Sequence, residues 1–567
     1  MTPNQPPLNI ERLRETRNNF IKEVVALNES EAIQKISTNP IYPNMISEAM
    51  TSLELSEEET EIAKQIIEIH REPQSPQIMA RDYLLLSTLL PTCMVPILPD
   101  LEYVPDNLIV QTLETLLQPM SVFMTNSDME QKAWQILLAH NYVAKRIKLD
   151  PHSEFTSSCA DLILKAKDTY VCLNLEAHDL GDFSKERAEI FKFILEKHNL
   201  VSESNPTGEN PMVGVLISHV GGDDSTLYAI QLLKDLQAKQ IPSLLICDST
   251  ASITTQKYIE ELATKTLLLP KGIKEAIQLV QKQNLEFIIL TDPLHDAEHP
   301  VFLLATQQLA KHHIALQNTI ISTGFDTTNH ILVDSSLSNA ENFKTGFTES
   351  LHIAGDLSRA LTISIPEDED LPDLDRESIG INEETILYVS AAPLHYITPS
   401  FRTCLINILS QKPNSKLLLL PFHDENISEN DRELFKSHFE HEAQNQSVDK
   451  SNILILTDTI PNLQVLDSYL SLSNCYLDTF PCNSQLPAGR SLAQNLSVIT
   501  LSGKLLRECT TSTFRDSHKE KVHVAQSKEQ YIESAIKVEI EPISHLSLDE
   551  PNTTLVDVLT KIKSNNP

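Results

Sequence analysis

Glycine is scarce in this chain and unevenly distributed. Only 12 of the 567 residues are glycine, and none of them lies within residues 1–180. Because glycine supplies the positive-φ positions of tight hairpins and strand-to-helix turns, its absence points to helices joined by other turn residues. Helix signals agree, with a capping box at Ser56–Glu59 and apolar spacing over Asn107–Leu117 and Asp128–Arg146. Residues 1–200 are therefore predicted to form an all-α domain.

Positive charge is also in short supply. The chain has 45 Lys and Arg against 78 Asp and Glu, which gives a net charge of −33. This balance argues against a nucleic-acid or anionic-membrane partner, because both need a basic surface. It leaves a nucleotide ligand open, since backbone amides and helix N-termini can hold phosphate.

Paired cysteines and long apolar runs are missing as well. The eight cysteines contain no CxxC pair, which is typical of reduced thiols rather than of a disulfide or zinc framework. The N-terminus lacks the apolar core of a signal peptide, and the most apolar segment, Tyr83–Leu98, is interrupted by Pro91 and Pro96. These features predict a soluble, cytoplasmic protein without a membrane span.

Several common site motifs are absent. GxGxxG, GxxxxGK[ST], GxSxG and HExxH do not occur, which argues against a dehydrogenase, a P-loop NTPase and a zinc protease. His295 and His299 have the i, i+4 spacing of a helical metal chelate, but no cysteine or third ligand accompanies them. No metal site and no cofactor are predicted.

Beyond residue 200 the pattern changes to short apolar runs that alternate with amphipathic stretches. Such alternation predicts parallel, doubly wound sheets of an α/β fold, and the acidic segment Ile365–Gly380 divides it into two parts. The predicted domains are residues 212–364 and 381–545, both Rossmann-like, followed by a polar tail over 546–567. The predicted strands are Met212–Ser218, Ser243–Asp248, Thr266–Leu269, Phe287–Thr291 and Leu316–Ser322 in the first, and Ile386–Ser390, Lys416–Leu420, Ile453–Thr457, Cys475–Asp478 and Ser497–Leu501 in the second.

Two turns could face a ligand. Ser218–Thr226 follows the first strand and contains two glycines, two aspartates and two hydroxyls; it is either a ligand-binding turn or a plain turn that caps the next helix. Thr479–Ser484 lies between a buried strand and a predicted helix at Pro487–Asn495. In open α/β sheets, ligands collect outside the carboxyl ends of strands, where both turns would lie.

The second turn carries a family resemblance. LDTFPCN (Leu477–Asn483), followed by VITLSG (Val498–Gly503), is similar to the donor-site segment of the protein O-GlcNAc transferases and the bacterial adhesin N-glycosyltransferases. MVGVLISHVGGDDST and HHIALQNTIISTGFDTT resemble blocks of the family's first Rossmann-like domain, in the same order. The resemblance implies a GT-B fold, with the acceptor side in the first domain and a UDP-sugar held mainly by the second.

The resemblance also implies site residues. Asp224 aligns near the family's candidate base, which is a histidine in the O-GlcNAc transferases, and a second family histidine falls here around Val465–Leu466. Tyr396 stands where the family has a lysine that neutralises the donor phosphates. Arg490, near the position of an aspartate that binds the ribose, is the basic residue closest to the turn in the sequence. It is expected to take the lysine's place at the diphosphate, since a guanidinium binds phosphate bidentately. The expected donor-binding residues are Tyr396, Thr459, Ile460, Thr479, Asn483, Ser484, Gln485 and Arg490. The uracil base of the donor is expected near Thr459–Pro461.

Two functions follow from these observations. One is a glycosyltransferase that moves a sugar from a UDP-sugar co-substrate to a protein side chain. The other is an inert homologue that acts as a binding or scaffold subunit, for example of a partner glycosyltransferase. The segments that resemble the family favour neither function. The absence of the family's lysine and histidines at the aligned positions favours the inert homologue.

Overall fold

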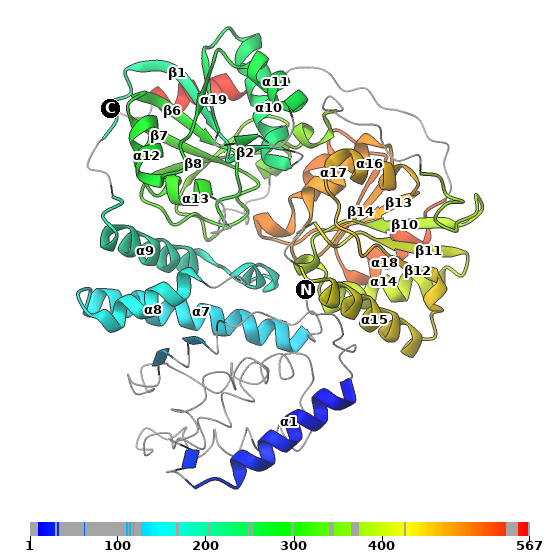
Figure 1. Cartoon of the computed structure of the whole chain (residues 1–567). Helices are drawn as coiled ribbons and strands as arrows, with labels where there is room; N and C mark the ends of the chain where they lie inside the picture. Colours follow the sequence, from blue (N-terminus) through cyan, green and yellow to red (C-terminus); the bar gives the residue numbers. More distant parts are fainter. Residues whose placement is uncertain are drawn as a thin grey trace. The chain divides into compact units, whose positions relative to one another are not determined.

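The structure is a computed structural model of the whole chain (Figure 1). Its contacts form two compact units, Met1–Leu175 with Ser428–His438, and Glu176–Ile427 with Phe439–Pro567. The capping box predicted at Ser56–Glu59 and most of Asn107–Leu117 lie outside the described residues. The structure describes residues 10–28, 31–32, 62, 109–110, 113–114, 117, 126–165, 169–201, 205–221, 223–247, 249–250, 253–295, 300–339, 345–364, 374–423, 427–539 and 554–564.

The described part of the first unit is helical. It contains α1 (Ile10–Val25), α7 (Asn126–Leu149), α8 (Glu154–Leu164) and the 3-10 helix η2 (Thr169–Asn174). Helix α7 confirms the helix predicted over Asp128–Arg146. Helix α8 begins after Ser153, whose side chain accepts a hydrogen bond from the backbone N–H of Phe155 at 3.2 Å and so caps the helix.

The second unit contains two parallel sheets, which confirms the predicted α/β class. Sheet 1, green in Figure 1, has seven strands in the order β5-β3-β1-β6-β7-β8-β9, and every neighbouring pair is parallel. The order reverses between β1 and β6, which is the topological switch point where doubly wound folds bind ligands. The strands are β1 (Asn210–Leu216), β3 (Ser243–Cys247), β5 (Lys265–Leu268), β6 (Leu285–Leu290), β7 (His312–Leu316), β8 (Thr328–Val333) and β9 (Ser350–Ile353).

Sheet 2 repeats this topology with six strands, in the order β12-β11-β10-β13-β14-β15. Its switch point lies between β10 and β13. The strands are β10 (Ile386–Ser390), β11 (Ser415–Leu419), β12 (Ile453–Ile455), β13 (Cys475–Leu477), β14 (Ser497–Leu501) and β15 (Val522–Ala525).

Helices alternate with the strands of both sheets along the chain and bury apolar residues against them. A short strand pair, β2 (His219–Val220) with β4 (Ser249–Thr250), extends the carboxyl edge of sheet 1. The helices between and after the strands of sheet 1 are α10 (Asp224–Ala238), α11 (Ile253–Leu262), α12 (Ile273–Gln281) and α13 (Pro300–Ala305). Those of sheet 2 are α14 (Pro399–Gln411), α15 (Glu429–Asn445), α16 (Leu463–Ser471), α17 (Gln485–Ala493) and α18 (Lys528–Ile536). The 3-10 helices are η3 (Ser335–Asn339), η5 (Ser358–Thr362), η6 (Leu394–Tyr396), η7 (Lys450–Asn452), η8 (Leu506–Glu508) and η9 (Thr511–Arg515).

One predicted strand is wrong in position. The prediction placed it at Leu316–Ser322, but β7 spans His312–Leu316. Both histidines fit the sheet because each has a buried partner: His312 stacks on Phe287 with ring centroids 5.2 Å apart, and His313 Nε2 accepts hydrogen bonds from the N–H groups of Leu309 and Ala310. The polar residues after Leu316 lie beyond the carboxyl end of the strand, where they are available to a site.

The C-terminal helix α19 (Thr554–Ser564) returns to sheet 1, and it lies by the green strands in Figure 1. Its Leu555, Val558, Leu559 and Ile562 are buried in a cluster that includes Ile314 of β7 and residues of α10. Lys563 forms an ion pair with Glu286 at 2.7 Å. The last helix of the chain is therefore part of the first sheet's core.

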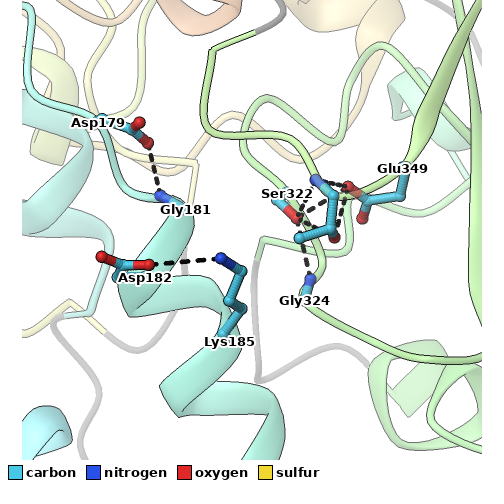
Figure 2. Close-up of polar contacts among 8 residues, drawn as sticks. Asp179, Gly181, Asp182, Lys185, Ser322, Gly324 and Glu349 are labelled. Carbon is cyan, nitrogen blue, oxygen red and sulfur yellow. Dashed lines mark hydrogen bonds and ion pairs between the residues drawn. The ribbon is translucent and has the colours of Figure 1, made fainter.

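Helix α9 (Gly181–Lys197) packs against the loop that follows β7 (Figure 2). Gly324 in this loop has φ +70°, and a Cβ at that position would lie 2.3 Å from the backbone oxygen of Ser184. The loop is held by buried Glu349, which accepts hydrogen bonds from Ser322 Oγ at 2.8 Å and from Thr323 N–H at 2.7 Å. Close backbone approach requires glycine here.

Replacing Gly324 with alanine is expected to lower the free energy of unfolding by about 2–3 kcal/mol, because strain at positive φ adds to a clash with backbone. Gly380 is the matched control, because its φ is +72° and a Cβ at that position would meet nothing within 4 Å. Gly380→Ala should cost only the conformational term, about 1–2 kcal/mol. Urea unfolding of both variants measures the difference, and equal losses would contradict the packing argument.

Candidate functional site

Polar residues line the carboxyl edge of sheet 1 at its switch point. Ser218, which follows β1, donates from its N–H and its Oγ to the carboxylate of Asp292, which follows β6, at 2.8 and 2.7 Å. Asn318, which follows β7, donates from Nδ2 to the carbonyl of Thr291 at 2.7 Å. Three neighbouring strand ends are thus joined by side chains at the edge where ligands bind in this topology.

Asp224 lies at this edge, on the first turn of α10. The helix is capped by Asp223, whose carboxylate accepts a hydrogen bond from Thr226 N–H at 2.9 Å. Asp224 is therefore not the capping residue; its Oδ2 accepts from Asn318 Nδ2 at 3.2 Å, and its side chain is only partly buried. A partly buried carboxylate that accepts a hydrogen bond from a neutral amide is suited to accept a proton from a bound group.

A network of neutral side chains connects this edge to sheet 2. Tyr228 of α10 donates from its hydroxyl to Gln485 Oε1 at 3.1 Å and accepts from Gln317 Nε2 at 3.1 Å. Gln485 Nε2 in turn lies 3.2 Å from Ser358 Oγ and 3.3 Å from Thr513 Oγ1. The structure thus brings the first turn of α17 to the same network as α10, which also carries Asp224. Burial raises the pKa of Tyr228 well above its usual value, so this phenol stays protonated.

Asp478 organises the predicted donor turn. It follows β13 and is fully buried, with Oδ1 accepting from Ser484 N–H at 2.9 Å and Oδ2 accepting from Thr500 Oγ1 at 2.7 Å. Burial raises the pKa of this carboxyl to about 6, and these hydrogen bonds oppose the rise. Asp478 was not among the predicted site residues, although it stands in the LDT motif.

The turn residues themselves are buried. Thr479 Oγ1 donates to the carbonyl of Cys482 at 2.9 Å, and Asn483 Nδ2 donates to the carbonyl of Thr479 at 3.1 Å. Asn483 Oδ1 is buried and has no hydrogen-bond partner among the described residues. Thr479, Asn483 and Ser484 lie together in this turn, and the side chains of Thr479 and Asn483 hydrogen-bond within the turn itself.

The other predicted donor residues lie on the same edge of sheet 2. Tyr396 follows β10 in η6 and contacts the thiol of Cys482 in the turn. Thr459 and Ile460 follow β12, and Ile460 N–H donates to the carbonyl of Phe422 beyond β11 at 3.0 Å. Since parallel strands end at one edge, these residues and the turn share the edge where a donor would bind.

Arg490 is placed differently from its neighbours in the prediction. It is buried in α17, where its Nε donates to Asp467 Oδ1 at 2.9 Å and its Nη2 to the other oxygen of the same carboxylate. Its Nη1 donates to the carbonyl of Ile363 at 2.5 Å. Through these hydrogen bonds Arg490 links α17 to α16 and to the end of η5.

Lys528 is a cation near the turn that the sequence reasoning missed. It begins α18 after β15, and its Nζ lies 5.7 Å from the ring centroid of Phe480 in the turn. Its ion pair with Glu176 is long, 3.7 Å, and both side chains are substantially exposed. Only the order of strands in the sheet brings position 528 near position 480, so spacing along the chain gave no signal.

Two carboxylates lie together beyond β8 and β9. Asp334 Oδ2 accepts from the N–H of Ser358, and Asp356 Oδ1 accepts from the N–H of Arg359 at 3.1 Å, so both hold the start of η5. Burial, and then the charge of Asp334, raise the pKa of Asp356 to about 6. Native Asp356 therefore retains a proton at pH values where the unfolded chain has lost it.

This raised pKa predicts a pH effect on stability. The contribution of Asp356 is fully present below about pH 4 and is lost as the pH rises through about 6. Asp356→Asn should therefore raise the free energy of unfolding by about 1–2 kcal/mol at pH 7.5 and change it little at pH 4.5. Asp375→Asn, at an exposed position, is the control. A gain that is independent of pH would contradict this assignment.

The described residues contain no cluster of three or more histidine, cysteine or acidic side chains able to hold a metal ion. His295 is half-buried and its carbonyl accepts from Arg187 Nη1, while His299 lies outside the described residues. None of the helices in the described ranges is long and apolar enough to cross a membrane.

Two Rossmann-like sheets with polar residues at their carboxyl edges define a GT-B, glycosyltransferase-like fold, as the resemblance implied. The chain is similar in structure to an O-GlcNAc transferase from Thermobaculum terrenum, with a TM-score of 0.51, 15% identity and coverage of 85% of this chain and 90% of that one. A glycosyltransferase from Rickettsia africae (TM-score 0.35, 8% identity, 63% of this chain and 94% of that one covered) and Anabaena HepE in complex with UDP and glucose (TM-score 0.34, 9% identity, 62% and 98% covered) also match. No family model and no curated protein matches the sequence.

Proposed function

We propose that this protein is a glycosyltransferase that transfers a sugar from a UDP-sugar to a protein side chain. The observation that carries the proposal is the network that joins α10, with Asp224 on its first turn, to Gln485 at the start of α17. A glycosyl transfer needs a base beside the acceptor and donors beside the leaving phosphate, and here the elements that carry the candidates meet.

On the acceptor side, Asp224 takes the proton of the attacking hydroxyl or amide. Asn318 orients the carboxylate through Nδ2, and Asn318 Oδ1 is a buried acceptor without a hydrogen-bond partner in the described part of the chain. Buried polar atoms left without protein partners are uncommon, and a bound group can satisfy them. The acceptor side therefore has both a base and an unmet hydrogen-bonding group.

On the donor side, the base of the nucleotide lies beside Thr459 and Ile460 and the diphosphate beside Thr479–Gln485. Backbone N–H groups at the start of α17 and the positive end of its dipole favour a diphosphate there. Lys528 supplies the positive charge that the sequence lacks at Tyr396. Arg490 takes no part in this arrangement, because Asp467 and the carbonyl of Ile363 occupy its guanidinium.

A specific observation favours the second candidate, an inert homologue that serves as a binding or scaffold subunit. Every polar atom of the Gln485 side chain has a protein partner, drawn from Tyr228, Ser358, Thr510 and Thr513. A diphosphate at this helix end would compete with those hydrogen bonds. The glycosyltransferase requires that a nucleotide can displace these hydrogen bonds of Gln485, whereas the inert homologue does not.

Calorimetric titration with UDP, UDP-GlcNAc and UDP-glucose tests binding, and UDP release in the presence of cell extract tests transfer. The enzyme predicts binding of at least one UDP-sugar and release of UDP. Binding without release would support the inert homologue, and absence of both would overturn the proposed donor site.

The same titration tests Lys528. Lys528→Ala is expected to weaken UDP binding by about tenfold, the effect of losing one charge-assisted contact worth about 1.5 kcal/mol. Lys537→Ala, at the exposed C-terminal end of the same helix, should leave the affinity unchanged. Equal affinities in both variants would remove Lys528 from the donor site.

A further inference from the structure

Three histidines stand on three adjacent strands of sheet 1. His312 begins β7, His330 lies on β8 and His352 on β9, and we name this set the histidine ladder. Their ring centroids are 5.8 Å apart between His312 and His330, and 5.0 Å between His330 and His352. They share the sheet face of Ile314 and Leu332, because side chains alternate along a strand and His352 is in register with Leu332.

Two rungs of the ladder are directly bonded. His330 Nδ1 and His352 Nε2 are 3.0 Å apart, which is a hydrogen bond between two imidazoles. Such a bond needs one N–H and one lone pair, so the accepting ring must be neutral. If both rings become imidazolium, the bond is lost and two positive charges face each other.

Helix α19 packs on this same face. Its four buried apolar residues belong to the cluster that contains Ile314 and Leu332 of sheet 1. Lys561 of α19 is close enough to His352 to lower the pKa of its imidazole, together with the larger effect of burial. The helix therefore presents a cation to the histidine ladder.

The remaining charges around the ladder do not offset protonation. Lys311 precedes His312 and lowers the pKa of its imidazole, whereas Glu286 of β6 raises it. Glu286 is already paired with Lys563 of α19 at 2.7 Å. Asp557, the acidic residue of α19, is exposed and lies one helical turn before Lys561, but the charge of this helix that acts on His352 is that of Lys561.

We propose that the histidine ladder is an acid-sensitive clasp for α19, and that protonation of the ladder loosens this helix from sheet 1. Because α19 also packs against α10, whose first turn carries Asp224, release would loosen the helix that supports the acceptor side. The proposal concerns the stability of α19 and does not depend on the proposed transfer reaction.

The direction of the pH effect on the packing of α19 follows from the proton affinities of the packed and released states. Burial, and then the neighbouring His352 and His312, lower the pKa of His330 to about 4, below the ordinary value of 6.5. The released state therefore binds protons more readily, and packing of α19 weakens as the pH falls from about 6.5 towards 4. Above pH 6.5 the neutral histidine ladder contributes fully to the packing of α19. With allowance for solvent around half-buried rings, release at pH 5 should increase by roughly tenfold.

Hydrogen exchange of the full chain at pH 5.0 and 7.5, corrected for intrinsic rates, measures this release in peptides that cover residues 554–564. Protection of these amides is expected to fall about tenfold at pH 5.0 in the wild type. The double variant His330→Gln/His352→Gln should keep its protection at pH 5.0, because neither side chain can be charged. His441→Gln, at an exposed position on α15, should behave as the wild type.

Lys561→Gln supplies a second test that does not disturb the core, because Lys561 is exposed. Removing this cation should move the midpoint of α19 release to a more acidic pH, because the protonated ladder then repels the helix less. Protection that is equal at both pH values in the wild type would overturn the proposal. An unchanged midpoint of α19 release in Lys561→Gln would also overturn the proposal. The same holds if the double variant loses as much protection at pH 5.0 as the wild type does.

Discussion

Asp224→Asn is expected to lower the turnover of a UDP-sugar by about 10²- to 10⁴-fold, the usual contribution of a general base. Asparagine has nearly the same shape as aspartate and can still hydrogen-bond to Asn318, but it cannot accept a proton. The loss should appear in kcat, with little change in UDP affinity, because the proposed donor site lies beside sheet 2. UDP release under saturating donor measures it.

Asp223→Asn is the matched control, one residue earlier in the same turn. Asp223 caps α10 through a hydrogen bond from Thr226 N–H, and asparagine caps helices as well as aspartate does. This variant should keep both turnover and stability. If the two variants retain equal activity, Asp224 is not the base, and a wild type that binds UDP without turnover identifies the inert homologue.

Arg490→Ala is expected to lower the free energy of unfolding by about 3–5 kcal/mol, because it removes the guanidinium that pairs with a partly buried carboxylate. Asp467 would lose two hydrogen bonds from the guanidinium, and the carbonyl of Ile363 would lose one. The side chains of Arg490 and Asp467 are 4% and 18% exposed, so water replaces these bonds poorly. Urea unfolding measures the loss.

The control is the variant Arg490→Met/Asp467→Leu, which removes both charges and keeps apolar volume. It should recover much of the lost stability, as replacement of a buried ion pair by apolar residues often does. UDP affinity should be the same in the folded Arg490→Ala protein and in the wild type. A variant with wild-type stability and weakened UDP binding would instead make Arg490 the phosphate contact that the sequence suggested.

The regular elements of both sheets could be predicted because their information is local. Ile386–Ser390 and Ser497–Leu501 are apolar runs bounded by polar residues, and the predicted bounds match β10 and β14. The error at β7 arose because histidines look polar in a sequence, whereas neutral imidazoles can be buried against an aromatic ring or backbone N–H groups. The strands β8, β9 and β15 were also missed, and each of them contains a histidine: His330, His352 and His523.

The candidate site was predictable only in part. LDTFPCN indicated Thr479–Ser484 as a candidate donor turn through its family resemblance, but it could not show that the side chains of Thr479 and Asn483 bond to the turn itself. Asp224 was one of three residues able to cap α10, and only the structure shows that Asp223 is the cap.

The sequence by itself determined the α/β class and the two strand-helix alternations, because hydrophobic periodicity depends on neighbours a few residues apart. Only the tertiary structure decided which side chains meet: Gln485 with Tyr228, Lys528 with the Phe480 turn, and Arg490 with Asp467. These pairs depend on the order of strands in a sheet and on the packing of distant segments. Such contacts are set by the burial of the whole core, so no spacing along the chain encodes them.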